Sequence, residues 1–213
     1  MSPSSTKEKI LEAALELFNE HGLANVRLQM IADKTGISVG NLAYHFKNKK
    51  AIVQAISSKL SEEFGDILAM YRSRNGLPDL DAQLDRLYDF VTGNPYCFFD
   101  AKEVRSYFSR ETGAAPGSGA EKLLYQLRHR FSAMQETGLL MKEPASGFFD
   151  QEAFSIWMYI IFLIPTSDLL NQAVPSKRVF KRWIWSRFMP FFTDRGKVQF
   201  CTLIEPELWP ERS

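Results

Sequence analysis

The feature that most constrains the fold is a tight turn, Gly36-Ile37-Ser38, between two short helical patterns. The pattern before it covers residues 28–35, and the pattern after it places Leu42 and Phe46 four residues apart, on one helical face. Glycine can adopt the left-handed conformation that ends a helix, and a serine side chain can cap the helix that follows. Two short helices joined by such a turn form a helix-turn-helix. Helices this short are unstable alone, so we expect neighbouring helices to hold them.

The sequence predicts a further helix on each side of these two short helices. Ser5-Thr6-Lys7-Glu8 is a capping box, and the helix that it starts ends at His21-Gly22. Asn48 can cap a long helix of apolar residues at three- and four-residue spacing, which reaches about residue 71. We therefore expect two domains, a three-helix head over residues 1–50 and a larger domain over residues 51–213, joined by this long helix.

The second domain is also expected to be helical, because no segment of useful length alternates as a strand does. The expected helices lie near residues 80–93, 97–111, 118–137, 151–173 and 177–193. Pro165 should kink or split the fourth of these helices. The tail, residues 196–213, yields no prediction. The fold class is therefore all-α.

Composition narrows the kinds of partner. The net charge of +1 excludes a generally basic surface, so DNA contacts must come from a local patch, such as the three lysines that follow the turn region. The two cysteines, Cys97 and Cys201, provide no disulfide framework, and with no evident signal peptide they suit the cytoplasm. The histidines and cysteines are not spaced as a metal site. Catalytic and nucleotide-binding motifs are missing as well, so we expect neither an enzyme nor a cofactor.

A set of residues around the turn resembles the TetR family of bacterial transcriptional regulators. The matching residues are Ile31-Ala32, Gly36-Ile37-Ser38, Gly40, Leu42, His45-Phe46 and Lys49, and the resemblance covers residues 5–56. Two departures stand out. Val26 and Arg27 replace the usual Thr or Ser, so the second helix lacks its usual cap. Ala43 replaces a Tyr that meets a DNA phosphate in the family.

The resemblance implies which residues contact DNA. The base-contacting residues would be Gln29, Val39, Gly40, Asn41 and Tyr44. Asn41 can pair with adenine through two hydrogen bonds, and Val39 or Tyr44 can touch a thymine methyl. The phosphate-contacting residues would be Arg27, Ser38, His45, Lys47 and Lys49, which set the register without reading sequence.

Aromatic residues are abundant in the second domain. Core packing and a dimer interface explain many of them, but a cavity for an apolar or aromatic molecule is the functional alternative. The candidate pocket residues are Tyr88, Phe98, Phe99, Tyr107, Phe108, Tyr125, Trp157 and Phe162. The last two expected helices are apolar over a wide arc and need cover, which a two-fold dimer would supply. The candidate interface residues are Phe154, Ile161, Leu169, Phe180, Trp183, Ile184 and Phe188.

The resemblance thus implies a homodimeric repressor that binds double-stranded operator DNA and leaves it when a small apolar or aromatic effector binds. Two alternatives stay open within this class, an activator and a regulator that responds to a protein. A third, from another class, is a small-molecule carrier with a vestigial DNA-binding head. The sequence does not identify the effector, the operator or the regulated genes.

Overall fold

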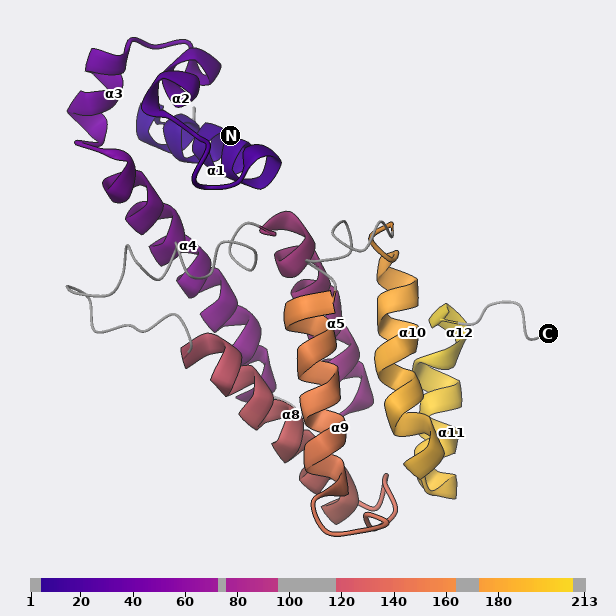
Figure 1. The fold of residues 1–213 in the computed structure, drawn as a ribbon. Helices are drawn as coiled ribbons and strands as arrows, with labels where there is room; N and C mark the ends of the chain where they lie inside the picture. The colour runs from indigo at the N-terminus through magenta and orange to yellow at the C-terminus, as the bar shows by residue number, and fades with distance from the viewer. Residues whose placement is uncertain (1–4, 73–75, 96–117, 164–172, 209–213) are drawn as a thin grey trace. The chain divides into compact units, whose positions relative to one another are not determined.

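The computed structural model describes residues 5–72, 76–95, 118–163 and 173–208. They form an all-α protein (Figure 1), and an isolated bridge between Leu140 and Phe192 is the extended pairing within these ranges. The α-helices are α1 (Thr6–His21), α2 (Leu28–Thr35), α3 (Val39–His45), α4 (Lys49–Ala69), α5 (Leu77–Gly93), α8 (Ser118–Glu136), α9 (Phe148–Met158), α10 (Lys177–Phe188), α11 (Asp194–Leu203) and α12 (Glu205–Leu208). Short 3-10 or π turns extend three of them: η1 (Met70–Arg72), η2 (Tyr159–Leu163) and η4 (Met189–Phe191).

The described residues fall into two compact units. The first unit contains residues 5–63, 94–95 and 118, and the second contains residues 64–72, 76–93, 119–163 and 173–208. The division lies within α4, after Glu63, whereas the sequence suggested a boundary at residue 50. Helix α4 therefore contributes residues to both units.

The first unit begins with the predicted capping box. The Ser5 side chain accepts from the Glu8 backbone N–H, and the Glu8 carboxylate accepts from the Ser5 N–H at 2.7 Å. Its core consists of side chains with no exposed surface, from α1, α2, α3 and α4: Ile10, Ala14, Phe18, Ile31, Ala32, Leu42, Ile52 and Val53. At the start of α4, Asn48 caps the helix as predicted, by accepting from the Ala51 N–H at 2.9 Å.

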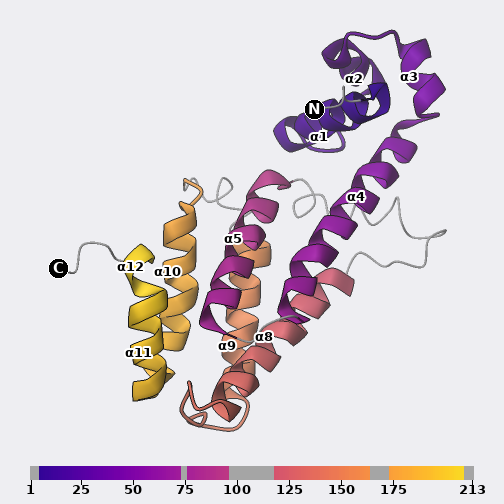
Figure 2. The same cartoon turned by 180° about the vertical axis from the view of Figure 1, so that it is seen from behind.

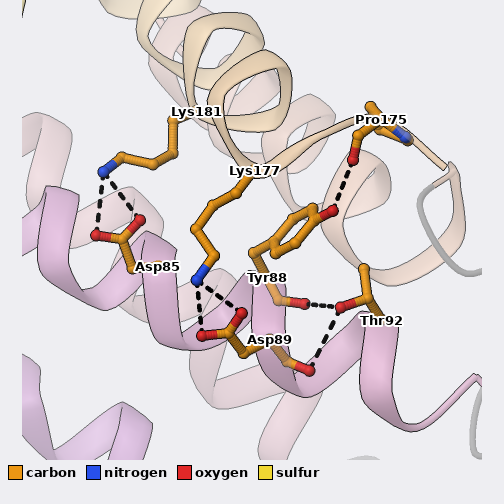
Figure 3. A network of polar contacts seen from close by, with 7 residues as sticks. All are labelled: Asp85, Tyr88, Asp89, Thr92, Pro175, Lys177 and Lys181. Carbon is orange, nitrogen blue, oxygen red and sulfur yellow. Dashed lines mark hydrogen bonds and ion pairs between the residues drawn. The ribbon is translucent and has the colours of Figure 1, made fainter. Parts of the chain in front are cut away.

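In the second unit, α5 and α10 run antiparallel and are joined by a ladder of charged pairs (Figure 3). Lys181 binds Asp81 and Asp85, at 2.7 and 2.9 Å, and Lys177 binds Asp89 at 2.7 Å. The indole N–H of Trp185 donates to Asp81 at 2.9 Å. Burial disfavours the charge on Lys181, but the hydrogen bonds that its ammonium donates to both carboxylates outweigh this effect and raise its pKa above the usual value. The ladder fixes the register of α10 against α5.

Aromatic stacking fills the core of the second unit. The Phe131 ring lies between Phe149 and Phe188, with centroids at 4.9 and 4.4 Å. The fully buried Trp185 contacts Phe188 and Phe200, which connects α10 to α11. Figure 2 shows α10, α11 and α12 side by side from behind.

The C-terminal helices α11 and α12 were not predicted from the sequence. Gly196 explains how α11 lies so close to the turn after α8, because a Cβ there would lie 2.2 Å from the Leu139 carbonyl oxygen. Thr193 caps α11 and also donates through its hydroxyl to Gly138 at 2.7 Å. The tail is thus built into the second unit.

The structure describes the fourth expected helix only as far as Leu163. Its α-helical part, α9, ends at Met158 and continues as the π turn η2. Pro165, where the sequence predicts a kink or a split, lies outside the described residues, so this stays a prediction. The expected helix at 97–111 also lies outside the described residues. Across the described ranges, we find no helix with the length and apolar character needed to cross a membrane.

Candidate nucleic-acid interface

The turn between α2 and α3 has the predicted geometry. Gly36 is in the left-handed region, at φ 73° and ψ 29°, where residues with a Cβ are strained. The N–H of Gly36 donates to Asp33 at 3.2 Å, and the N–H of Ile37 donates to Ala32 at 3.1 Å. These bonds satisfy the last carbonyls of α2 and direct the chain into α3. As expected from the sequence, Arg27 at the start of α2 makes no side-chain cap.

Helix α3 is seven residues long and is anchored along one side. Ser38 caps it by accepting from the Asn41 N–H at 3.1 Å. Leu42 is fully buried and Phe46, just after the helix, is nearly so. Because these two side chains fix one face, Asn41 and Tyr44 are left exposed, and Tyr44 keeps 86% of its surface accessible.

The other predicted base-contacting residues occupy different environments. Gln29 is exposed on α2, but its amide donates a hydrogen bond to Asp33 at 2.7 Å. This hydrogen bond must break, or become shared with the base, before Gln29 can contact DNA. Val39 is half-buried at the first position of α3. Unlike Gln29, Asn41 is exposed without a side-chain hydrogen bond among those described, so its amide is available to a base.

Gly40 has no packing reason to be a glycine. It lies in the first turn of α3 with ordinary helical φ, and a Cβ built there would meet only the Ser38 hydroxyl, at 3.8 Å, an ordinary van der Waals distance. Glycine in a helix costs roughly 0.5–1 kcal/mol relative to alanine. The missing side chain thus has a cost that no contact of the described residues offsets, and it leaves the backbone open to close approach from outside.

The predicted phosphate-contacting residues divide into two groups. Arg27 and Lys47 are exposed cations, available to an external anion. Lys49 instead donates to the Leu23 backbone carbonyl, and its ammonium lies 6.0 Å from the Phe18 ring centroid. It therefore holds the start of α4 against the loop after α1, a structural role that its sequence position did not reveal.

The remaining two phosphate candidates also have internal partners. The Ser38 oxygen already accepts the capping bond, although its own hydroxyl hydrogen can still be donated. His45 is half-buried and its ring makes an edge contact with Tyr44, with centroids 5.3 Å apart. Elsewhere in the head, Lys34 is paired with Glu16 at 2.7 Å, and this hydrogen bond raises its pKa.

The structure describes four of the eight predicted pocket residues, Tyr88, Tyr125, Trp157 and Phe162. Tyr88 packs its ring against Phe180 at 5.4 Å and donates its hydroxyl to Pro175 at 2.8 Å (Figure 3). Tyr125 is 67% exposed beside His129. Trp157 and Phe162 contact one another, with centroids 5.9 Å apart. The other four, Phe98, Phe99, Tyr107 and Phe108, lie outside the described residues.

The predicted interface residues separate by burial. Phe180, Ile184 and Phe188 are fully buried within the second unit and Ile161 is nearly so, whereas Leu169 lies outside the described residues. Phe154 is 46% exposed and stacks on Trp157 at 5.5 Å. Trp183 is half-exposed and stacks on Tyr159 at 3.9 Å. The structure thus joins one interface candidate, Phe154, to two pocket candidates, Trp157 and Phe162, in one exposed aromatic cluster.

Sequence reasoning missed two polar features of the second unit. The charged ladder had a readable signal, since three aspartates on α5 and two lysines on α10 recur every fourth residue. Arg130 had none, because a basic residue on an amphipathic helix is normally exposed, yet it is 3% exposed. No group of three or more potential metal ligands occurs within the described ranges.

Comparisons with known proteins agree with this geometry. Residues 10–56 match the model of the family described as bacterial regulatory proteins, tetR family. The HTH-type transcriptional regulator BetI of Escherichia coli strain S88 is 29% identical over 103 residues, 48% of this chain and 49% of that protein. BetI of Klebsiella pneumoniae strain 342 is 28% identical over 100 residues, 47% and 48% of the two chains. The match spans about half the length of these relatives.

Solved structures extend the likeness of fold to nearly the whole chain. A TetR-family transcriptional regulator from Marinobacter aquaeolei VT8 superimposes with a TM-score of 0.72 at 21% identity, over 94% of this chain and 97% of that one. The SmeT–triclosan complex gives a TM-score of 0.59 at 18% identity, over 90% and 93%. The helix-turn-helix head, residues 10–56, therefore belongs to the tetR family of bacterial regulatory proteins, and the chain as a whole has the fold of solved TetR-family regulators.

Proposed function

We propose that this protein is a sequence-specific transcriptional regulator, acting in the bacterial cytoplasm, that reads the major groove of DNA with α3. The observation that carries the proposal is Gly40, which leaves the first turn of α3 without a side chain although no contact within the described part of the chain requires a glycine there. A backbone exposed in this way can approach a phosphate or base edge closely. Asn41 and Tyr44 are presented on the same short helix, exposed and anchored from behind by Leu42.

Within this proposal the residues divide by role. Asn41 and Tyr44 read bases, with Val39 and Gln29 at the margins of the same surface, while Arg27 and Lys47 bind phosphates. Ser38 and His45 also bind phosphates, through the hydrogen-bond donors that their internal contacts do not use. We assign Lys49 mainly to holding the head together, because its ammonium already binds the Leu23 carbonyl.

We further propose that two copies assemble through the exposed aromatic cluster of Phe154, Trp157 and Phe162, together with the half-exposed Trp183 on α10. Phe154 and Phe162 each keep 46% of their surface exposed, and contiguous exposed aromatic surface is typical of an interaction site. A two-fold pairing would bury it and place two recognition helices on one operator. A Phe154→Glu variant should be monomeric by sedimentation and should lose operator affinity, whereas Val198→Glu, which changes an exposed apolar residue on α11, should remain a dimer.

We propose that the regulator is a repressor that a small apolar or aromatic effector releases from DNA. SmeT is named in complex with triclosan, a small aromatic molecule, and by its fold this chain is similar to that protein. Helix α4 offers the connection, since residues 49–63 belong to the first unit and residues 64–69 to the second. A ligand that moves the last turns of a continuous helix also moves its first turns.

The proposed function is tested by titrating fluorescent DNA from the upstream region of its own gene with the protein at several salt concentrations. A regulator should bind this DNA more tightly than a scrambled fragment, with an affinity that falls steeply with salt. Equal binding to both fragments would leave a non-specific DNA-binding protein, and no binding would favour a carrier whose head does not read DNA.

A further inference from the structure

Arg130 is a buried cation whose hydrogen bonding is incomplete. It lies on α8 with 3% of its surface exposed. One terminal nitrogen, Nη2, donates to Gln83 Oε1 at 2.7 Å, and the guanidinium carbon lies 4.8 Å from the centroid of the Tyr71 ring. Its Nε is buried and has no hydrogen-bond partner. Nearly all buried donors in native proteins are paired, so this one needs an explanation.

The charge of Arg130 also lacks a direct counter-ion. Among the ion pairs of the described residues none includes Arg130, and Asp79 attracts it only from a longer distance. Burial accordingly lowers the pKa of Arg130 to about 10. Burying a cation without an anion is costly.

A second buried cation in the same unit, Lys181, provides a comparison, because its role is structural. Lys181 is as buried as Arg130, but it contacts two carboxylates, Asp81 and Asp85, within 3 Å. Arg130 instead rests on the neutral amide of Gln83. A neutral partner leaves the cation able to attract an anion that comes from outside.

The partner of Arg130 is connected to α4. The Gln83 amide donates to the Ile67 carbonyl at 3.0 Å, and Gln126 donates to the Leu68 carbonyl at 2.8 Å. These two carbonyls belong to the last turn of α4, whose orphan acceptors need such donors. Any group that replaces Gln83 on the guanidinium therefore disturbs the bonds that hold the end of α4.

We propose that Arg130 binds the carboxylate of an acidic effector, so that the small molecule of the proposed function is an apolar acid and not a neutral compound. The inference rests on that proposed function for its biological meaning. A carboxylate matches the planar fork of a guanidinium and can accept two parallel hydrogen bonds, from the unpaired Nε and from the Nη2 that Gln83 now occupies. Displacement of Gln83 would then change the end of α4, which is the step that couples binding to release of DNA.

The test uses the full-length protein, four apolar acids and their matched neutral alcohols: octanoate, decanoate, benzoate and 2-naphthoate against octanol, decanol, benzyl alcohol and 2-naphthalenemethanol. Thermal shift ranks the eight compounds, and calorimetry then measures the best acid and its alcohol. The variants are Arg130→Met and, as matched control, Arg128→Met, which removes an exposed arginine two residues away on the same helix. A charge-assisted pair predicts that the acid binds about 10- to 100-fold more tightly than the alcohol.

The expected result is that this acid preference is present in the wild type and in Arg128→Met, and falls below about twofold in Arg130→Met. The ligand-free Arg130→Met protein should keep a melting temperature near that of the wild type, because an apolar side chain replaces an uncompensated charge. If no acid is preferred in the wild type, or if the preference survives in Arg130→Met, the proposal is wrong. A large loss of melting temperature without loss of preference would make Arg130 structural.

The DNA titration is run separately on the same proteins. An acid preference that depends on Arg130, in a protein that binds no DNA, would support the ligand site and refute the regulatory function. Specific DNA binding without any acid preference would support the regulatory function and refute the ligand site. If both hold, the acid should weaken DNA binding by the same factor by which DNA weakens binding of the acid.

Discussion

Replacing Gly40 by alanine should make the head more stable and a worse DNA binder. The added Cβ meets no atom closer than the Ser38 hydroxyl at 3.8 Å, and the backbone there is helical, so the native structure accommodates it without strain. Gly→Ala at a compatible position stabilises by about 0.4–1 kcal/mol, chiefly by restricting the unfolded chain. We expect Gly40→Ala to fall within this range.

The stability change must be measured in the head itself. All four tryptophans lie after α8 in sequence, so intrinsic fluorescence does not report on the first unit. Amide hydrogen exchange does, through the N–H groups of Leu42 and Phe46, which donate to Ser38 and Leu42 at 2.9 and 2.8 Å. A gain of about 0.4–1 kcal/mol should slow their exchange roughly two- to fivefold.

The same methyl should obstruct the DNA. If a phosphate or base edge lies in van der Waals contact with the bare backbone, the protein must draw back, and we expect an affinity loss of about tenfold or more, or 1.4 kcal/mol. Gly93→Ala is the matched control, because a Cβ there meets no atom within 4 Å and the residue lies in the second unit. A Gly40→Ala protein that binds operator DNA as tightly as the wild type would refute the argument that this glycine serves an external partner.

Four further substitutions test the rest of the structure. Gly196→Ala should destabilise the second unit by about 3 kcal/mol, because its Cβ would overlap a backbone carbonyl at 2.2 Å, and tryptophan fluorescence during urea unfolding should show this. Lys181→Met should cost about 3–5 kcal/mol by leaving the buried Asp81 without its cation. Since the pKa of Lys181 is raised, its contribution is complete below pH 10.5 and is lost as pH rises through the raised value, so the deficit of the variant should shrink there. Lys47→Ala should lower the salt slope of DNA binding by about one without changing stability, whereas Lys49→Ala should destabilise the head by about 1.5 kcal/mol; the reverse pattern would overturn this division.

Local chemistry made the head predictable from sequence. The capping box at Ser5, the left-handed Gly36 and the cap at Ser38 depend on residues within a few positions of one another, and all three were confirmed. The role of Lys49 was not predictable in this way. Its bond to Leu23 spans 26 residues and depends on how α4 returns to the loop after α1, which no local pattern encodes.

The second unit shows the same limit more strongly. The helices α5, α8 and α10 were predicted from apolar periodicity. Periodicity does not distinguish a helix face that packs within one chain from a face that is exposed in that chain. Phe180 and Phe188 are fully buried within the second unit, while Phe154 is not, although all three lie at helical spacing among other apolar residues. The C-terminal helices did have a signal, since Phe200, Ile204 and Leu208 recur every fourth residue and are all buried.

The most direct test of the central claim is selection of binding sites from a random double-stranded DNA library by the full-length protein, repeated with Asn41→Ala. If α3 reads the major groove in a dimer, the wild type should enrich a two-fold symmetric site whose half-site centres lie about 10 base pairs apart or a multiple of that. Asn41→Ala should enrich the same site with one base relaxed in each half, at a cost of about 1–3 kcal/mol in affinity. Absence of any enriched sequence, or an identical site selected by Asn41→Ala, would contradict the account.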